Sequence, residues 1–300
     1  MFNYIIMERV ELTKFLKDKR PNLTDNSLKS YTSLLWTLNK NLFDEDKLNI
    51  EDLEDTEKVI DYIKTKPLSS YKTILAALYV LTENEIYREL MLDKIKEYKD
   101  DKDKNEMNEK QKKEYMTQDE ILAKYKELEE RAIKLYKKRK DKRTDEDKQK
   151  IQEYVILALM SGIFMEPRRL LDFTEIKINN VDKEKDNWID FKKKKIHYNV
   201  YKNSGTKGED VIPLPNDLSK ILKKWIRLNS GNEYLLVNTE GNKLSNVTLH
   251  SRLKNITGTG GNMFRHSFLT EKYQGVLELK DNMKKMGSSI ANINAYIQKV

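Results

Sequence analysis

One apolar segment limits what this chain can fold into. The run YVILALMSGIFMEPRRLLDF, residues 154–173, is the least polar stretch of a chain in which 35% of residues are charged. It predicts a buried helix that ends on two adjacent arginines, Arg168 and Arg169. Burying a guanidinium costs several kcal/mol unless an anion meets it. Either Asp172 is that anion, or the partner comes from outside the chain.

The composition limits the number of domains, the kind of partner and the kinds of metal site that this chain can have. Three hundred residues suggest about two domains, and 38% hydrophobic residues are enough for packed cores. The net charge of +8 favours a polyanionic partner, either nucleic acid or an acidic membrane surface, although a Lys/Glu-rich proteome would leave the same excess. The absence of cysteine excludes disulfides and thiolate metal sites, and three scattered histidines make a zinc site improbable.

The chain carries no predicted membrane span or secretion signal. Its longest apolar run is about twelve residues, short of the ~20 that cross a bilayer, and its N-terminus lacks a basic region before an apolar core. We therefore expect an intracellular protein, located wherever its target lies.

The pattern of apolar residues predicts a mainly α protein with a small β-sheet, an α+β fold. Residues 1–98 contain four or five short amphipathic helices and predict a compact helical domain. Residues 99–116 are nearly all charged and predict a linker, or a solvated helix. The sequence TQDE at 117–120 fits a capping box that opens a second domain, 117–300.

Within that second domain the periodicity changes after residue 173. Short β-branched and aromatic runs predict a sheet of about three strands, with KNSGTKGE, residues 202–209, as a hairpin loop. Helical patterns then return. The glycine-rich TGTGG at 257–261 matches neither a P-loop nor a dinucleotide fingerprint, so we interpret it as a loop before a helix.

Catalytic templates are mostly missing, but basic residues stand at the ends of predicted elements. Arg169 follows the apolar segment, Lys202 enters the hairpin loop, and Arg265 lies in the first turn of a helix. Guanidinium groups and helix N-termini both favour phosphate. Taken one at a time, each has a plainer explanation: Arg169 and Asp172 could form an intrahelical pair, and Lys202 is one of 57 basic residues.

Taken in order, these residues resemble the motifs of one family across essentially the whole chain. PRRLLDF resembles the first arginine box of the tyrosine recombinases, or phage-integrase family, and NMFRHSFLT resembles the second. YKNSGTKGEDVIPLP is similar to the hairpin that carries the catalytic lysine, and KMGSSIANINAYIQKV to the final segment with the tyrosine. The wording of these boxes is closest to integrases of virophages and giant DNA viruses.

The resemblance implies a role for each residue. Tyr296 would be the nucleophile, Arg169 and Arg265 the phosphate-binding arginines, and Lys202 the general acid, with Lys207 as the lesser candidate. Asp172 is the acid of the first box, and it would orient the arginine or stabilise its loop.

Two positions depart from the family's pattern. Asn262 stands where a histidine is usual in the second box, and Ser288 stands where the last box usually has His or Trp. His266 follows Arg265 directly but is no obvious substitute, because many members have a histidine there as well.

The implied function is site-specific DNA recombination through a covalent 3′-phosphotyrosine, serving integration of a viral or mobile element. It requires no cofactor, neither metal nor ATP. Residues 1–98 would bind DNA as a core-binding domain, and the protein would assemble as a dimer or tetramer on double-stranded DNA, with no membrane partner. The alternatives are a type IB topoisomerase-like enzyme that relaxes DNA and a catalytically weakened DNA-binding protein.

Overall fold

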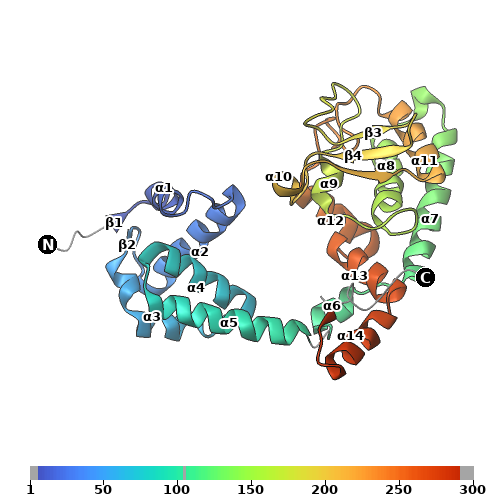
Figure 1. The fold of residues 1–300 in the computed structure, drawn as a ribbon. Coiled ribbons are helices and arrows are strands. Elements are labelled where there is room, and N and C mark those ends of the chain that lie inside the picture. Colours follow the sequence, from blue (N-terminus) through green and yellow to red (C-terminus); the bar gives the residue numbers. More distant parts are fainter. Residues whose placement is uncertain (1–5, 104–105, 291–300) are drawn as a thin grey trace. The chain divides into compact units, whose positions relative to one another are not determined.

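Two compact units make up the chain, residues 1–106 and 107–300, in a computed structural model that describes residues 6–103 and 106–290 (Figure 1). The charged segment 99–116 contains the end of one helix, α5, and the whole of another, α6, and the division between the units falls inside it. No helix of the described residues is long and apolar enough to cross a bilayer.

The first unit is helical. Its elements are, in order, β1 (Ile6–Met7), α1 (Arg9–Lys19), α2 (Asp25–Phe43), β2 (Leu48–Asn49), the 3-10 helix η1 (Glu51–Glu54), α3 (Thr56–Ile63), α4 (Leu68–Thr82) and α5 (Glu85–Asp103). Thr24 caps α2 by accepting a hydrogen bond from the backbone of Ser27. The apolar faces of α1 and α4 are buried in one core.

The second unit combines helices with one small sheet. Its elements are α6 (Glu109–Glu114), α7 (Gln118–Lys137), the 3-10 helix η2 (Lys140–Lys142), α8 (Asp145–Met160), α9 (Leu170–Thr174), β3 (Trp188–Asp190), β4 (Lys195–Tyr198), α10 (Ser204–Lys207), β5 (Asp210–Pro213), α11 (Asn216–Leu228), α12 (Asn246–Thr257), α13 (Gly261–Lys272) and α14 (Gly275–Lys285). The predicted mainly α fold with a small sheet is thus confirmed.

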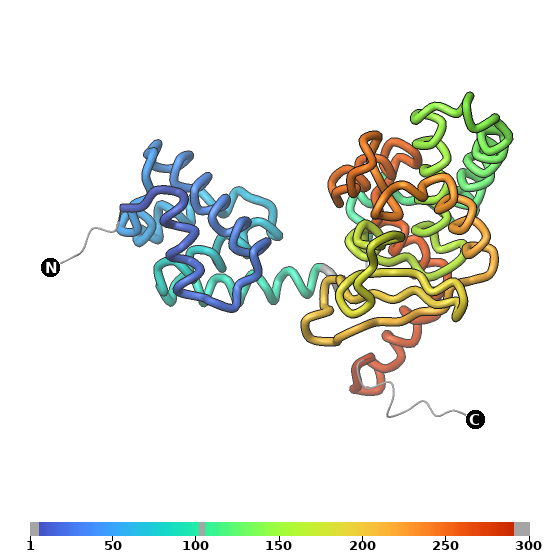
Figure 2. The backbone as a smooth tube through the Cα atoms, turned by 90° about the horizontal axis from the view of Figure 1, so that it is seen from above, coloured from blue at the N-terminus to red at the C-terminus, as the bar shows by residue number. Residues whose placement is uncertain are grey.

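The sheet is an antiparallel meander in the order β3-β4-β5 (Figure 2). Ile196 of β4 pairs with Ile189 on one side and Ile212 on the other. The loop between β4 and β5, predicted as a hairpin loop, contains the short helix α10.

Helix α8 lies at the centre of the second unit, in contact with α7, α11 and α12. All seven residues from Tyr154 to Met160 are buried. The capping boxes of α7, at Thr117 and Glu120, and of α8, at Thr144 and Asp147, fix where these two helices begin.

Candidate functional site

The apolar segment is not one helix, contrary to the prediction. Helix α8 ends at Met160, and residues 161–169 form a loop before α9. Gly162 has φ +90°, a left-handed conformation that an α-helix does not contain. Pro167 follows and supplies no backbone donor, so the helix cannot continue through it. Arg169 therefore occupies the N-cap position of the five-residue α9.

Asp172 binds Arg168, the first arginine of the pair. Arg168 Nε donates to Asp172 Oδ2 over 2.7 Å, and its Nη1 donates to Asp210 Oδ2 over 2.7 Å. The guanidinium carbon lies 4.1 Å from the centroid of the Tyr198 ring. The alternative in which Asp172 pairs with Arg169 is thus not what the structure shows, because Arg168 forms a bridge to two carboxylates instead.

Arg169 and Arg265 have no carboxylate partner among the residues that the structure describes. Neither side chain forms a hydrogen bond or an ion pair within the described ranges 6–103 and 106–290, and Arg169 is exposed. Arg265 projects from α13, whose first residue, Gly261, lies against Leu170 of α9: a Cβ on Gly261 would be 2.8 Å from Leu170 Cδ2. This close approach brings the Arg265 helix to the start of α9.

The loop between β4 and β5 carries Lys202 and Lys207, the two candidates for the catalytic lysine. The Tyr201 hydroxyl donates to the carbonyl of Gly208 over 2.9 Å and closes this loop. Glu209 contacts His197 Nδ1 at 2.8 Å. Lys202 and Lys207 are both exposed, and neither forms an ion pair in the part of the chain that the structure describes.

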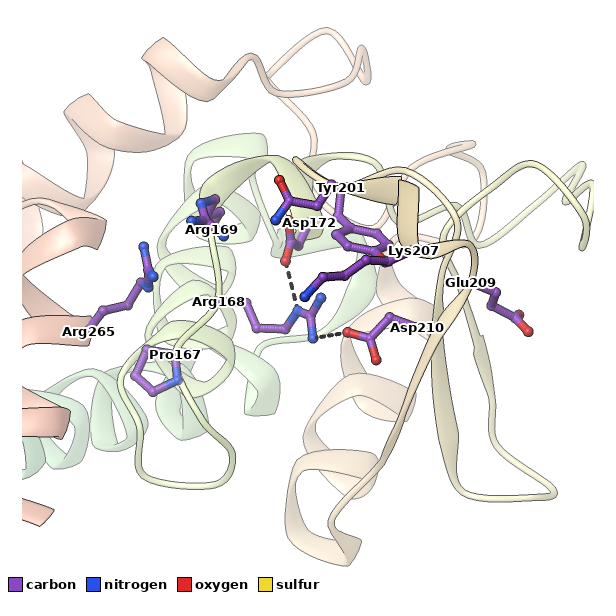
Figure 3. A pocket seen from close by; sticks show the side chains of 10 residues that line it. Pro167, Arg168, Arg169, Asp172, Tyr201, Lys207, Glu209, Asp210 and Arg265 are labelled. Atoms are coloured by element: carbon purple, nitrogen blue, oxygen red, sulfur yellow. Dashed lines mark hydrogen bonds and ion pairs between the residues drawn. The ribbon is translucent and has the colours of Figure 1, made fainter. Parts of the chain in front are cut away.

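These elements surround one cavity of about 460 Å³ (Figure 3). Its lining consists of Pro167, Arg168, Arg169, Asp172, Tyr201, Asn203, Lys207, Glu209, Asp210 and Arg265. Four of these side chains are cationic and three are anionic. Arg168 binds Asp172 and Asp210, and Glu209 binds His197. The remaining three cations have no anionic partner in the described part of the chain and can meet an external anion.

The electrostatics of Asp172 follow from its burial. Its side chain is 5% exposed, and burial raises the pKa of this carboxyl, while the hydrogen bond from Arg168 acts in the opposite direction. Its Oδ1 is also buried and has no hydrogen-bond partner among the described residues. The pKa of Arg168 is raised: burial lowers it, and the hydrogen bonds to Asp210 and Asp172 outweigh that effect. Arg168 therefore stays charged and holds Asp172 in a fixed geometry at the wall of the cavity.

Asn187 joins two walls of the site, a role that no pattern in the sequence indicates. Its side-chain amide donates to the carbonyl of Asp172 over 3.0 Å and to the carbonyl of Val200 over 2.8 Å. Its oxygen accepts from the backbone of Asn199 and Val200. A fully buried asparagine thus links α9 to the chain just before the loop that carries Lys202.

Of the residues that the sequence singles out, four line the cavity: Arg169, Asp172, Lys207 and Arg265. Lys202 lies between two lining residues, and its own side chain is outside the lining. Three others are also outside it: Asn262 and His266, exposed on α13, and Ser288, half-buried after α14. Tyr296 lies outside the described residues.

Sequence reasoning missed several lining residues, notably Arg168, Tyr201 and Asp210. The doublet of arginines was visible, and the distance of four residues from Arg168 to Asp172 is one at which side chains can meet. Nothing in the sequence pattern identifies Asp210 as the second partner, because the two residues are 42 positions apart.

Three comparisons relate this chain to known proteins. A sequence model of the phage integrase family matches residues 114–300, more than half of the chain. Among solved structures, the crystal structure of XerA recombinase is similar at 14% identity and a TM-score of 0.34, covering 88% of this chain and 82% of that one. No curated protein matches the sequence. The family match, over the region that holds the cavity, shows that the chain belongs to the phage integrase family, the tyrosine recombinases.

Proposed function

We propose that this chain is a site-specific DNA recombinase that cuts and rejoins strands through a covalent 3′-phosphotyrosine at Tyr296. The observation that carries the proposal is the convergence of Arg169, Lys207 and Arg265, none with a carboxylate partner in the described structure, on one cavity. Such an arrangement favours a phosphate group, to which guanidinium can bind through two hydrogen bonds.

The chemistry follows from the charge of a phosphodiester. Attack at phosphorus builds further negative charge on the non-bridging oxygens, and two fixed guanidinium groups stabilise that charge in the transition state. A free tyrosine has a pKa of about 10 and is protonated at neutral pH, so nearby cations would help Tyr296 ionise and attack. The covalent bond conserves the phosphoester energy, and rejoining then needs no ATP.

The departing 5′ oxygen needs a proton. We assign this to Lys202, which occupies the motif position of the catalytic lysine and lies between two residues of the cavity lining, Tyr201 and Asn203. A lysine on a loop can act as general acid once a substrate orders it. Lys207, whose side chain already lines the cavity, would contact the phosphate backbone instead.

We also propose a domain organisation and an assembly for this recombinase. Residues 1–98 would be the core-binding domain, residues 99–116 the linker, and residues 117–300 the catalytic domain. Each chain would supply one nucleophilic tyrosine. Exchange between two duplexes requires several cleavages, so a dimer or tetramer would assemble on DNA. Integration of a viral or mobile element is the role that the motif wording favours.

A nicked substrate that traps the covalent intermediate tests the function. Arg169→Ala and Arg265→Ala should each lower the rate of adduct formation by at least ~10²-fold, the usual effect of removing one transition-state donor. Arg227→Ala, which removes an exposed arginine of α11 away from the cavity, is the matched control and should retain the wild-type rate.

Three other outcomes would redirect the proposal. Relaxation of supercoiled plasmid by dilute protein would favour a topoisomerase-like enzyme. Tight DNA binding without any adduct from the wild type would indicate a DNA-binding protein that has lost catalysis. Equal adduct rates in Arg169→Ala, Arg265→Ala and wild type would move the phosphate site away from the cavity.

A further inference from the structure

Arg168 differs from its neighbour in every contact it makes. Its side chain is 18% exposed, and two of its donors are occupied by Asp172 and Asp210. Its guanidinium lies over the ring of Tyr198, and the guanidinium carbon is 5.9 Å from the centroid of the Tyr201 ring. Figure 3 shows both ion pairs at the wall of the cavity. Arg168 is therefore held in place and has its charge already engaged.

The two carboxylates pose a problem for an anionic ligand. Asp172 and Asp210 both line the cavity that Arg169 and Arg265 share. A carboxylate roughly 10 Å from a phosphate raises the energy of the bound state enough for about a tenfold effect at an effective dielectric constant of about 20. Two unneutralised carboxylates would thus oppose the same charge that the arginines are placed to stabilise.

We propose that Arg168 is a positioning residue that binds both Asp172 and Asp210 and cancels one of their two negative charges, so that these carboxylates oppose a bound phosphate less strongly where Arg169 and Arg265 act on it. The inference rests on the proposed function, since it assigns Arg168 a part in the same site. Arg168 does not itself touch the phosphate. Its position between α9 and the first residue of β5 also holds the basic loop 199–209 near α9.

Charged side chains from several elements face Asp172. Arg168 and Arg169 act on it from the segment before α9, and Asp210 acts on it from β5. The same cavity also contains Lys207, Glu209 and Arg265. Without Arg168, two acids remain close together with no directly bonded cation, and a proton would bind there more tightly.

Four full-length variants separate neutralisation from a purely structural effect: Arg168→Gln, Arg168→Lys, and Arg168→Gln combined with either Asp172→Asn or Asp210→Asn. Arg168→Gln should lower adduct formation on the nicked substrate by about tenfold or more. Arg168→Lys, which keeps the positive charge, should recover part of that loss. Each double variant restores the net charge of the trio and should recover most of it, although the cross-link is still missing.

The pH dependence gives a readout that a structural role would not change. The ratio of the Arg168→Gln rate to the wild-type rate should rise as the pH is lowered, because protonation of the carboxylates removes the opposing charge. The double variant with Asp172→Asn should lose this dependence. Double variants that remain as slow as Arg168→Gln, or a ratio that is flat with pH, would overturn the proposal.

A measurement without DNA keeps this test separate from the proposed function. Relative to wild type, Arg168→Gln should lower the melting midpoint by about 5 °C at neutral pH, with a smaller difference in acid, and adding Asp172→Asn should restore it. An equal difference at both pH values would contradict the neutralising role. A wild type that forms no adduct, with this pH-dependent pattern intact, would reject the DNA-cleaving function and leave the electrostatic role of Arg168 standing.

Discussion

The side-chain amide of Asn187 donates to the backbone carbonyl of Asp172 over 3.0 Å, and so connects the start of the sheet to the helix that follows the two arginines. The same side chain makes three more hydrogen bonds, all to the backbone of Asn199 and Val200. One buried residue therefore connects the helix that follows Arg168 and Arg169 to the loop that carries Lys202.

Replacing Asn187 should weaken both the fold and the reaction. Asn187→Ala leaves four backbone groups, one buried and three partly buried, without their partner and should lower the free energy of unfolding by about 3 kcal/mol. Urea denaturation of the full chain measures this, and the exposed Asn242→Ala is the control. An unfolding free energy within about 0.5 kcal/mol of wild type would show that the four bonds are not needed.

The N-terminus of α8 should make stability depend on pH. The hydrogen bond from Lys138, together with that from the backbone of Thr144, lowers the pKa of Asp147. A group whose pKa is lower in the folded state stabilises the fold above its unfolded pKa, and this contribution is lost as pH falls through the folded pKa. Asp147→Asn should therefore lower the melting temperature at about pH 7, and the difference should shrink as the pH is lowered towards about 3.

Asp145→Asn is the matched control for that experiment, because Asp145 is in the first turn of the same helix and is largely exposed. Its melting temperature should change little at either pH. A pH-independent loss in Asp147→Asn would indicate that its contribution is only the cap geometry.

The two lysines of the loop should have separable effects. Lys202→Ala should slow cleavage by about 10²-fold on ordinary DNA, the scale of a lost general acid. It should be restored on a substrate whose leaving 5′ oxygen is replaced by sulfur, because a thiol has a pKa of about 8.5 and leaves without a proton. Lys207→Ala should instead weaken DNA binding and reduce its dependence on salt.

Lys193→Ala, at an exposed lysine in the turn between β3 and β4, controls for the loss of one positive charge. If the sulfur substrate restores Lys207→Ala and not Lys202→Ala, the two assignments are exchanged.

The absence of histidine at positions 262 and 288 should slow DNA cleavage and leave DNA affinity unchanged. Asn262 is three residues before Arg265 on α13, on the same side of the helix, and its amide is a neutral donor. A charge-assisted bond is about twice as strong as a neutral one, so Asn262→His should speed adduct formation by about tenfold. Ser288→His should act in the same direction, and both should leave the DNA dissociation constant unchanged.

Asn255→His on α12 is the control, since it adds an exposed histidine elsewhere in the same unit. Equal rates in wild type, Asn262→His and Ser288→His would show that neither position takes part in cleavage.

Local patterns predicted the elements of this fold well. The capping box at Thr117 and Glu120, the buried face of α4 and the three-stranded sheet all follow from residues close together in the sequence. The same local reasoning failed at residues 161–169, because a run of apolar residues does not reveal that Gly162 takes a positive φ.

The candidate site was predictable only in part. The motif order identified Arg169 and Arg265, and the structure brings these two into one lining. The partners of Arg168 could not be predicted, since its ion pair with Asp210 joins residues from separate elements. Asn187 was missed for the same reason: its bonds depend on tertiary packing, not on any local pattern.

The chemical identity of the trapped adduct tests the central claim most directly. After reaction with a nicked substrate, nuclease and protease digestion should leave one modified peptide, and mass spectrometry should place the 3′-phosphonucleotide on Tyr296. Tyr296→Phe should bind the same DNA with wild-type affinity and yield no adduct. An adduct on another residue, or one that persists in Tyr296→Phe, would contradict the account.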